Sequence, residues 1–414
     1  MNTRVDLAGV SVRNLALQLL SYQACTLPRI SVGHEAHWSR HPIHRWYFIT
    51  EGLPIGLVKR AVAQTPGPIL DPFSGAGTVL AEAKLDSKSA TGVDVNPFMC
   101  FASHVKTRTY ETDKILPTLE QVMRNCVEWR GVNVGSNQLT RLKKYYTLST
   151  LQKLQSLKAS IRSISDVSLR NLFFLCFVAV AIKSSRLSRT PALRYKGEQS
   201  ARFPVFRKFN ERVFDALLDL GTNGRDSQEL ESDVIRGDSR SLGFLKNKYA
   251  LVVTSPPYCN NVDFIRHSQL ELLWSEFASG SSDLGRLRHA AITSCEAMAH
   301  ASKDEGVLPL QVRRIVERVQ RRSDRRYHRV IEQYFNGMAS HFDAVFSVLR
   351  NGGTGIYVIG DSWFQDVYVP THKILGASAR GSGFRSVRTH WLRKRFTGRP
   401  HKHSLSEYII ELRK

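Results

Sequence analysis

Hydrophobic residues along this chain follow two spacings that alternate. Short apolar runs at residues 69–70, 89–94 and 250–253, each ending in turn-forming residues, indicate β-strands. Apolar residues three to four positions apart at 148–161 indicate an amphipathic helix. Over residues 68–97, a strand, a glycine-rich turn, a helix-forming stretch and a second strand follow one another. That order predicts a βαβ unit, and hence an α/β fold.

The segment 131–230 has a different character. Its apolar spacing predicts helices, and the apolar run from Leu172 to Ile182 covers eleven residues. Because a membrane-spanning helix needs about 20 apolar residues, this run predicts a buried helix instead. Between Gln138 and Val213 the sequence holds 16 Lys and Arg residues against three acids. We therefore expect a basic helical insertion over 131–230, after which the α/β pattern returns.

Lysine and arginine dominate the charge of the whole chain. The 414 residues include 59 Lys and Arg against 36 Asp and Glu, a net charge of +23, while the hydrophobic share of 42% is that of an ordinary globular protein. Such an excess predicts a polyanionic partner, and nucleic acid is favoured over an acidic membrane surface. Residues 311–330 hold eight arginines and two acids, and residues 388–403 hold six Lys and Arg and no acid. Both segments are candidate contacts for phosphate groups.

The six cysteines and the N-terminus bear on the compartment. No two cysteines form a C-x-x-C pair, and His44, His267 and His328 show no ligand spacing, so we expect free thiols and no metal site. Free thiols are typical of a reducing compartment. The first residues lack the apolar stretch of a signal peptide. These features predict a cytoplasmic, nucleoid-associated protein without membrane contact.

A glycine-rich loop follows the first strand of the βαβ unit. Gly75 and Gly77 would let backbone approach a ligand, and the next helix offers free N–H groups at its N-terminus. Asp94 lies 19 residues after Gly75, where an acidic side chain accepts hydrogen bonds from ribose hydroxyls in such folds. Leu80 occupies the third glycine position of the dinucleotide fingerprint, and no Gly-Lys-Ser/Thr follows, which excludes a phosphate loop of the Walker type. Together with Asp71, the loop predicts an adenosine-containing ligand.

A second loop, Ser255-Pro256-Pro257-Tyr258, follows the strand at 250–253. Open α/β sheets bind ligands at the carboxyl ends of their strands, so we expect both loops at one edge of the sheet. The prolines stiffen this loop, its carbonyls and serine hydroxyl can accept hydrogen bonds, and its tyrosine can stack on a flat group. These features suit the exocyclic amino group of a nucleobase. The alternative is a rigid turn with a surface tyrosine.

Three stretches together resemble the S-adenosylmethionine-dependent DNA amino-methyltransferases, which methylate N4 of cytosine or N6 of adenine. They are residues 71–78 (Asp-Pro-Phe-Ser-Gly-Ala-Gly-Thr), 92–97 (Gly-Val-Asp-Val-Asn-Pro) and 254–258 (Thr-Ser-Pro-Pro-Tyr). The resemblance implies a Rossmann-like class I methyltransferase fold, an α/β fold whose mostly parallel seven-stranded sheet ends in a reversed hairpin. It implies a catalytic domain over 36–130 and 231–414, with the basic helical insertion at 131–230 and an arginine-rich insertion at 275–333.

The resemblance also assigns roles to residues. It implies S-adenosyl-L-methionine as the cofactor, held by Asp71, Phe73, Gly75, Gly77, Thr78, Asp94 and Asp238. Residues 41–48 loosely resemble the family's additional cofactor-binding motif. The catalytic loop would accept the hydrogens of the target amine and stack its tyrosine on a flipped base through Ser255, Pro256, Pro257 and Tyr258. Either insertion could recognise the target, and we expect DNA phosphate contacts from Arg321, Arg322, Arg325, Arg326, Arg393, Lys394 and Arg395.

The product follows from the resemblance and not from geometry. A serine before Pro-Pro-Tyr is usual in the cytosine-N4 enzymes, so site-specific methylation of cytosine N4 in double-stranded DNA is favoured, with a cognate restriction endonuclease as a candidate partner. Adenine-N6 methylation of DNA and guanine-N2 methylation of RNA stay open. A catalytically inactive fold that binds DNA is a more remote alternative. Cytosine-C5 chemistry needs a cysteine nucleophile after a proline, whereas Cys259 follows Tyr258, so we interpret that thiol as a bystander.

Overall fold

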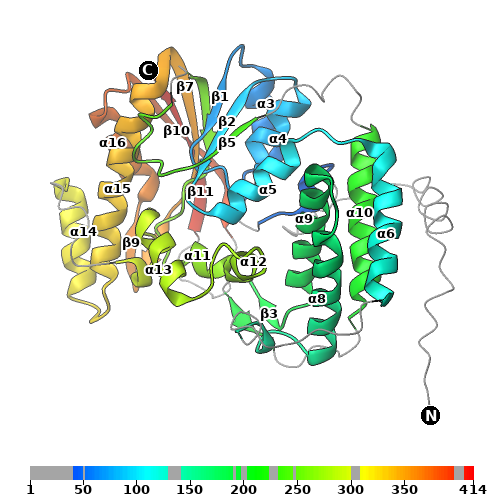
Figure 1. The fold of residues 1–414 in the computed structure, drawn as a ribbon. Helices are drawn as coiled ribbons and strands as arrows, with labels where there is room; N and C mark the ends of the chain where they lie inside the picture. Colours follow the sequence, from blue (N-terminus) through cyan, green and yellow to red (C-terminus); the bar gives the residue numbers. More distant parts are fainter. Residues whose placement is uncertain are drawn as a thin grey trace.

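A seven-stranded sheet forms the centre of the structure (Figure 1). The computed structural model describes residues 41–49, 52–128, 141–189, 193–196, 203–222, 232–245, 249–299, 308–395 and 405–414. The strands lie in the order β10 (Ser386–Arg395), β11 (Leu405–Arg413), β7 (Leu349–Gly360), β6 (Tyr249–Thr254), β1 (Ile69–Asp71), β2 (Ala90–Asp94) and β5 (Asp233–Arg236). Strand β11 runs antiparallel to both of its neighbours, and the other pairs are parallel. The predicted class I methyltransferase fold with its reversed hairpin is therefore confirmed.

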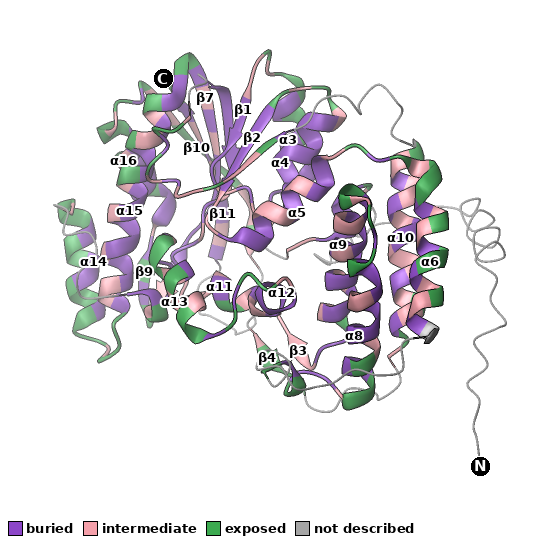
Figure 2. Cartoon of the chain, viewed as in Figure 1, coloured by how far each residue is buried: buried purple, intermediate pink, exposed green. Residues whose placement is uncertain are grey.

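Helices cover both faces of this sheet. Ile69 and Leu251 face a core shared with α3 (Ile55–Ala63) and α4 (Thr78–Leu85). The alternate residues Leu70 and Val252 face a core shared with the helices α15 (Tyr327–Val348) and α16 (Thr371–Gly381). Because both faces are covered, a central strand such as β6 is apolar along most of its length and buried at every position. Figure 2 shows the neighbouring strands β1 and β2 largely buried as well.

A bundle of helices occupies the chain between β2 and β5 and stands beside the sheet in Figure 1. After α5 (Pro97–Thr107) and the short η2 (Thr112–Lys114), its elements are α6 (Ile115–Glu128), α8 (Leu148–Arg162), α9 (Val167–Lys183), β3 (Leu187–Ser188), β4 (Arg194–Tyr195) and α10 (Val205–Thr222). Helix α6 precedes residue 131 but packs with α8 and α10, so the bundle includes residues before the expected insertion.

The apolar run predicted as a buried helix lies in α9, whose side chains Leu172, Phe173 and Phe177 are inaccessible to solvent. Its first turn is capped by Asp166, which accepts a hydrogen bond from the N–H of Leu169 at 3.0 Å. In the described part of the chain, no helix combines the length and apolar character needed to cross a membrane.

The segment between β6 and α15 forms several short elements. These are α11 (Phe264–His267), α12 (Gln269–Trp274), α13 (Ser281–Ala290), η4 (Glu296–Met298) and α14 (Leu310–Gln320). Helix α12 is attached to the helical bundle, because the indole N–H of Trp274 donates to the Tyr146 hydroxyl at 2.9 Å. Helix α14 lies at the opposite end of the molecule from α6 and α10 (Figure 1). The small hairpin β8 (Ser362–Phe364) and β9 (Val367–Val369) follows β7.

Candidate active site

A cavity of about 320 Å³ lies at the carboxyl ends of the parallel strands. One wall contains the loop after β1, the end of β2 and the end of β5, a second contains the loop after β6, and a third contains residues of the helical bundle. Of the residues predicted from the sequence, the cavity is lined by Phe73, Gly75, Asp94, Asp238, Ser255, Pro256, Pro257 and Tyr258. The predicted glycine loop and Pro-Pro-Tyr loop therefore lie at one site.

The glycine loop is fixed by hydrogen bonds from two directions. Gly75, with a φ of 48°, donates its N–H to the Asp94 carboxylate at 2.9 Å, and its carbonyl accepts from the Ser103 hydroxyl at 2.8 Å. Gly77 has a φ of 78°, which L side chains rarely adopt, and a Cβ there would lie 2.9 Å from Cα of Ser103. Gly75 lines the cavity and Gly77 does not. Packing on α5 is thus one physical reason for glycine at 77, and its predicted approach to a ligand stays a prediction.

The two acids predicted at this site have different surroundings. Asp71 is buried behind the glycine loop, where its Oδ1 accepts from the Thr254 hydroxyl at 2.6 Å and from the Phe73 N–H at 3.2 Å. Neither Asp71 nor the buried Thr78 lines the cavity, so their predicted part in cofactor binding stays a prediction. Asp94 does line it. Burial raises the pKa of Asp71 to about 7 and that of Asp94 to about 6.

The segment from Arg45 to Ile49 contributes five consecutive residues to the cavity wall. It includes part of η1 (His44–Trp46) and falls within the loosely predicted cofactor motif. Lys106 on α5 joins this segment to the glycine loop, because its buried ammonium donates to the carbonyl of Tyr47 and to that of Ala76. Burial lowers the pKa of Lys106 to about 7. These contacts make the segment and the glycine loop one continuous wall.

Asp238, predicted as a cofactor-binding residue, lies just after β5 and lines the cavity. The Arg240 guanidinium donates to both of its carboxylate oxygens, at 3.0 and 2.7 Å. Nearby, the buried His341 ring contacts the Phe73 ring at 4.8 Å between centroids and bonds to the Tyr357 hydroxyl at 2.9 Å. Burial lowers the pKa of His341 to about 4, so this imidazole is neutral at physiological pH.

The Ser255 hydroxyl in the second loop donates to the carbonyl of Val358 at 3.2 Å and also lies 3.4 Å from the Tyr258 hydroxyl. When its proton points to the Val358 carbonyl, the lone pairs of Ser255 Oγ remain available as acceptors. Cys259 is fully buried in the apolar core and does not line the cavity. Burial raises the pKa of this thiol well above its ordinary value, which keeps it protonated.

Tyr258 is less accessible than a surface tyrosine would be, at 7% exposure. The Arg395 guanidinium lies over its ring at 5.0 Å from the centroid, and its hydroxyl lies 3.4 Å from Glu407. Glu407 also accepts from Arg393 at 2.6 Å. Arg393 and Arg395, predicted as phosphate contacts, therefore lie in a charged group around the tyrosine, whereas Lys394 is exposed.

None of the seven residues predicted as phosphate contacts lines the cavity. Four of them lie in the turn between α14 and α15, where all are exposed: Arg321, Arg322, Arg325 and Arg326. Arg325 bonds to Glu296 at 2.6 Å, Arg322 pairs with Asp366, and Arg326 donates to a backbone carbonyl. This turn is a basic surface whose charges are partly compensated.

The sequence analysis missed a set of cations in the cavity wall. They come from the helical bundle and its β3–β4 hairpin and are Lys183, Arg189, Lys196 and Arg212. The high local charge between Gln138 and Val213 was the available signal, but it does not say which of 16 cations face the site. The structure thus brings the basic insertion, the glycine loop and the Pro-Pro-Tyr loop to one cavity.

Comparisons with known proteins place this chain among relatives that are methyltransferases. Residues 47–157 match the UPF0020 family, described as the RMKL-like methyltransferase domain. The type II methyltransferase M.AvaI of Nostoc sp. is 24% identical over 405 residues, covering 87% of this chain and 82% of the relative. The type II methyltransferase M.BsoBI of Geobacillus stearothermophilus is 24% identical over 286 residues, covering 60% and 55%.

A shorter match of 28% identity over 116 residues, 26% of this chain and 22% of the relative, links the chain to the type II methyltransferase M.MjaII of Methanocaldococcus jannaschii. Among solved structures, the rRNA methyltransferase aviRa from Streptomyces viridochromogenes aligns at 11% identity and a TM-score of 0.30, over 87% of this chain and 85% of that one. The sequence relatives confirm the predicted resemblance to the DNA methyltransferases.

Proposed function

We propose, from the premise that this chain is a methyltransferase related to the type II enzymes, that it transfers a methyl group from S-adenosyl-L-methionine to N4 of cytosine in double-stranded DNA. The observation that carries the proposal is the shared cavity: Gly75 and Asp94 on one wall and Ser255 to Tyr258 on the next. Two loops with separate chemical tasks, one for a nucleoside and one for an amine, open into the same space.

The cofactor wall suits the chemistry of S-adenosyl-L-methionine. Gly75 leaves the loop without a side chain beside the cavity, and Phe73 offers an apolar ring. Asp94 would accept from the ribose hydroxyls and Asp238 from the adenine amino group, because each carboxylate has more lone pairs than its observed donors use. When bound, this cofactor supplies an electrophilic methyl group on a sulfonium.

The second loop would prepare the nucleophile. An exocyclic amine has its lone pair delocalised into the base, so the protein must draw its hydrogens out of the plane. Ser255 Oγ, whose own proton can be donated to Val358, would accept one hydrogen, and the Pro256 carbonyl would accept the other. Holding the amine in line with the methyl group then supplies much of the catalysis. The buried, protonated Cys259 speaks against the thiolate chemistry of cytosine-C5 methylation.

Double-stranded DNA as substrate agrees with the names of the relatives and with the net charge of +23. A base inside a duplex cannot reach the cavity, so it must flip out toward Tyr258. Lys183 and Lys196 of the cavity wall would face the phosphates of that nucleotide. We propose a cytoplasmic role in restriction-modification, with an endonuclease as partner. Cytosine is favoured over adenine by Ser255 alone.

Methyl transfer from isotope-labelled cofactor to duplex DNA tests the proposal. We expect Ser255→Ala to lower the rate of methyl transfer about 100-fold or more, because it removes one preorganised hydrogen bond to the reacting amine. Cofactor affinity, measured by calorimetry, should stay within about twofold, since this hydroxyl belongs to the amine-binding loop. The matched control is Ser340→Ala, an exposed serine on α15. Label on RNA but not on DNA would overturn the substrate assignment.

A further inference from the structure

We propose that Asp219 on α10 is a positioning residue for the cofactor site. Its carboxylate binds the segment 43–49 and holds it in the cavity wall, an arrangement called the latch below. Through this latch, the helical bundle contributes to cofactor binding. The proposal rests on the proposed function in one respect, that the cofactor occupies this wall. The latch itself is described by contacts that exist without any ligand.

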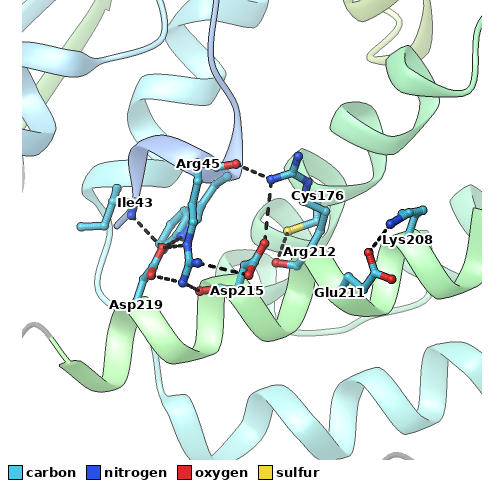
Figure 3. Close-up of polar contacts among 9 residues, drawn as sticks. Ile43, Arg45, Cys176, Lys208, Glu211, Arg212, Asp215 and Asp219 are labelled. Atoms are coloured by element: carbon cyan, nitrogen blue, oxygen red, sulfur yellow. Dashed lines mark hydrogen bonds and ion pairs between the residues drawn. The ribbon is translucent and has the colours of Figure 1, made fainter. Parts of the chain in front are cut away.

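The Asp219 carboxylate is the meeting point of the segment's donors (Figure 3). It is 2% exposed and accepts from the backbone N–H of Ile43 at 2.8 Å, the indole N–H of Trp46 at 2.8 Å and Nε of Arg45 at 3.0 Å. A second nitrogen of Arg45 reaches its other oxygen at 2.5 Å. One buried carboxylate thus fixes three of four consecutive residues, from a helix about 170 positions away in the chain.

Other residues of α10 and the bundle reinforce the latch. Arg212, about two turns before Asp219, donates to the carbonyl of Arg45 at 2.6 Å, and the carbonyl of Asp215 accepts from Arg45 at 3.2 Å. Farther along the segment, the Tyr47 hydroxyl donates to Glu271 at 2.7 Å, and the bundle's Arg189 donates to the same carboxylate at 2.6 Å. Contacts from α10 and from Glu271 on α12 therefore hold the segment from Ile43 to Tyr47.

The held segment is the part that contacts the glycine loop. Arg45 to Ile49 all line the cavity, and Ile49 lies so close to Gly75 that a Cβ on that glycine would be 3.2 Å from its side chain. If the segment were released, the cofactor wall would lose this backing on its bundle side. Binding would then have to order the segment again, and each backbone residue fixed on binding weakens affinity about fivefold to thirtyfold.

A face of the same helix supplies a matched control. Lys208 and Glu211 form an ion pair at 2.7 Å on α10, and both are substantially exposed (Figure 3). Glu211→Gln removes one charge from α10, as Asp219→Asn does, without touching the segment. Asp219→Asn can keep one oxygen toward Ile43 and Trp46 while it loses the ion pair with Arg45, whereas Asp219→Ala removes every contact.

The experiment combines hydrogen exchange with calorimetry on the full chain. We expect amides of residues 43–49 to exchange faster in Asp219→Ala, less so in Asp219→Asn and not at all in Glu211→Gln, while peptides of α9 stay protected. S-adenosylmethionine affinity should fall ~10- to 100-fold in the alanine variant, the cost of ordering one or two backbone residues again, and less in the asparagine variant. Duplex affinity measured without cofactor should be unchanged.

The results distinguish failure of the latch from failure of the proposed function. Unchanged exchange at 43–49 and unchanged cofactor affinity in a folded Asp219 variant would overturn the latch. Should the alanine variant not fold, the asparagine variant decides, and wild-type exchange and affinity there would overturn the latch equally. Absence of S-adenosylmethionine binding by the wild-type chain would instead contradict the proposed function, while the exchange comparison would still test the contacts of Asp219.

Discussion

Replacing Asp71 by asparagine should stabilise the protein at alkaline pH. Both hydrogen bonds that Asp71 accepts reach one oxygen, Oδ1, from Thr254 and from the backbone of Phe73. An asparagine can place its carbonyl oxygen at that position and keep both bonds. Asp71→Asn therefore removes a buried negative charge while the surrounding geometry persists.

The magnitude follows from the pKa of Asp71, which burial raises from 3.8 to about 7. Since the folded state binds this proton more tightly than the unfolded state, the wild type loses stability as pH rises from about 4 to about 7. Each unit of pKa corresponds to about 1.4 kcal/mol. Between pH 5 and pH 8, the variant should gain about 3 kcal/mol in free energy of unfolding relative to the wild type.

Urea unfolding of both proteins at pH 5, 6, 7 and 8 measures this difference. Because Asp94 titrates in both proteins, its contribution largely cancels in the comparison. The control is Asp343→Asn, which removes an exposed carboxylate from α15 and should leave the pH profile parallel to the wild type. If the free energy of unfolding of Asp71→Asn changed with pH in parallel with that of the wild type, the reasoning would be refuted. That result would mean that the charge of Asp71 does not destabilise the folded protein.

Three further changes test other parts of the site. Gly77→Asp should abolish S-adenosylmethionine binding in calorimetry while the circular dichroism spectrum stays unchanged, because a Cβ at 77 lies within 3.0 Å of α5 and forces the glycine loop to shift. Retained affinity would show that cofactor binding does not depend on the position of this loop. Glu407→Gln should slow methyl transfer about tenfold without changing cofactor affinity, since it weakens the charged group around Tyr258; a change confined to cofactor affinity would contradict this. Replacing Lys183 and Lys196 with alanine should flatten the salt dependence of DNA affinity, and an unchanged slope would place the duplex elsewhere.

The sheet and its two loops could be predicted from the sequence because their signals are local. Apolar runs indicate strands, glycines permit the positive φ of a tight loop, and paired prolines fix φ, so each signal can be read from a few neighbouring residues. The carboxyl-end rule for parallel sheets then brings Gly75 and Ser255 together without further information. The reversed strand β11 followed from resemblance and not from local pattern.

The charged contacts could not be predicted, because they depend on residues far apart in the chain. Asp219 lies on an amphipathic helix, where an acidic residue is usually exposed to solvent. The structure shows instead that Asp219 is buried and that its carboxylate binds Arg45 and Trp46. Likewise, Arg325 looked available for phosphate until the structure placed Glu296 beside it. Net charge predicts a polyanionic partner but does not identify the cations that meet it.

The central claim is that this chain methylates an exocyclic amino group of cytosine in duplex DNA. The direct measurement is to incubate the purified protein with duplex DNA and isotope-labelled S-adenosylmethionine, digest the DNA to nucleosides and locate the label by mass spectrometry. We predict label in N4-methylcytosine, lost in Ser255→Ala. Label in N6-methyladenine would overturn the choice of base, and label in 5-methylcytosine would contradict the mechanism, because the buried Cys259 thiol cannot supply that chemistry.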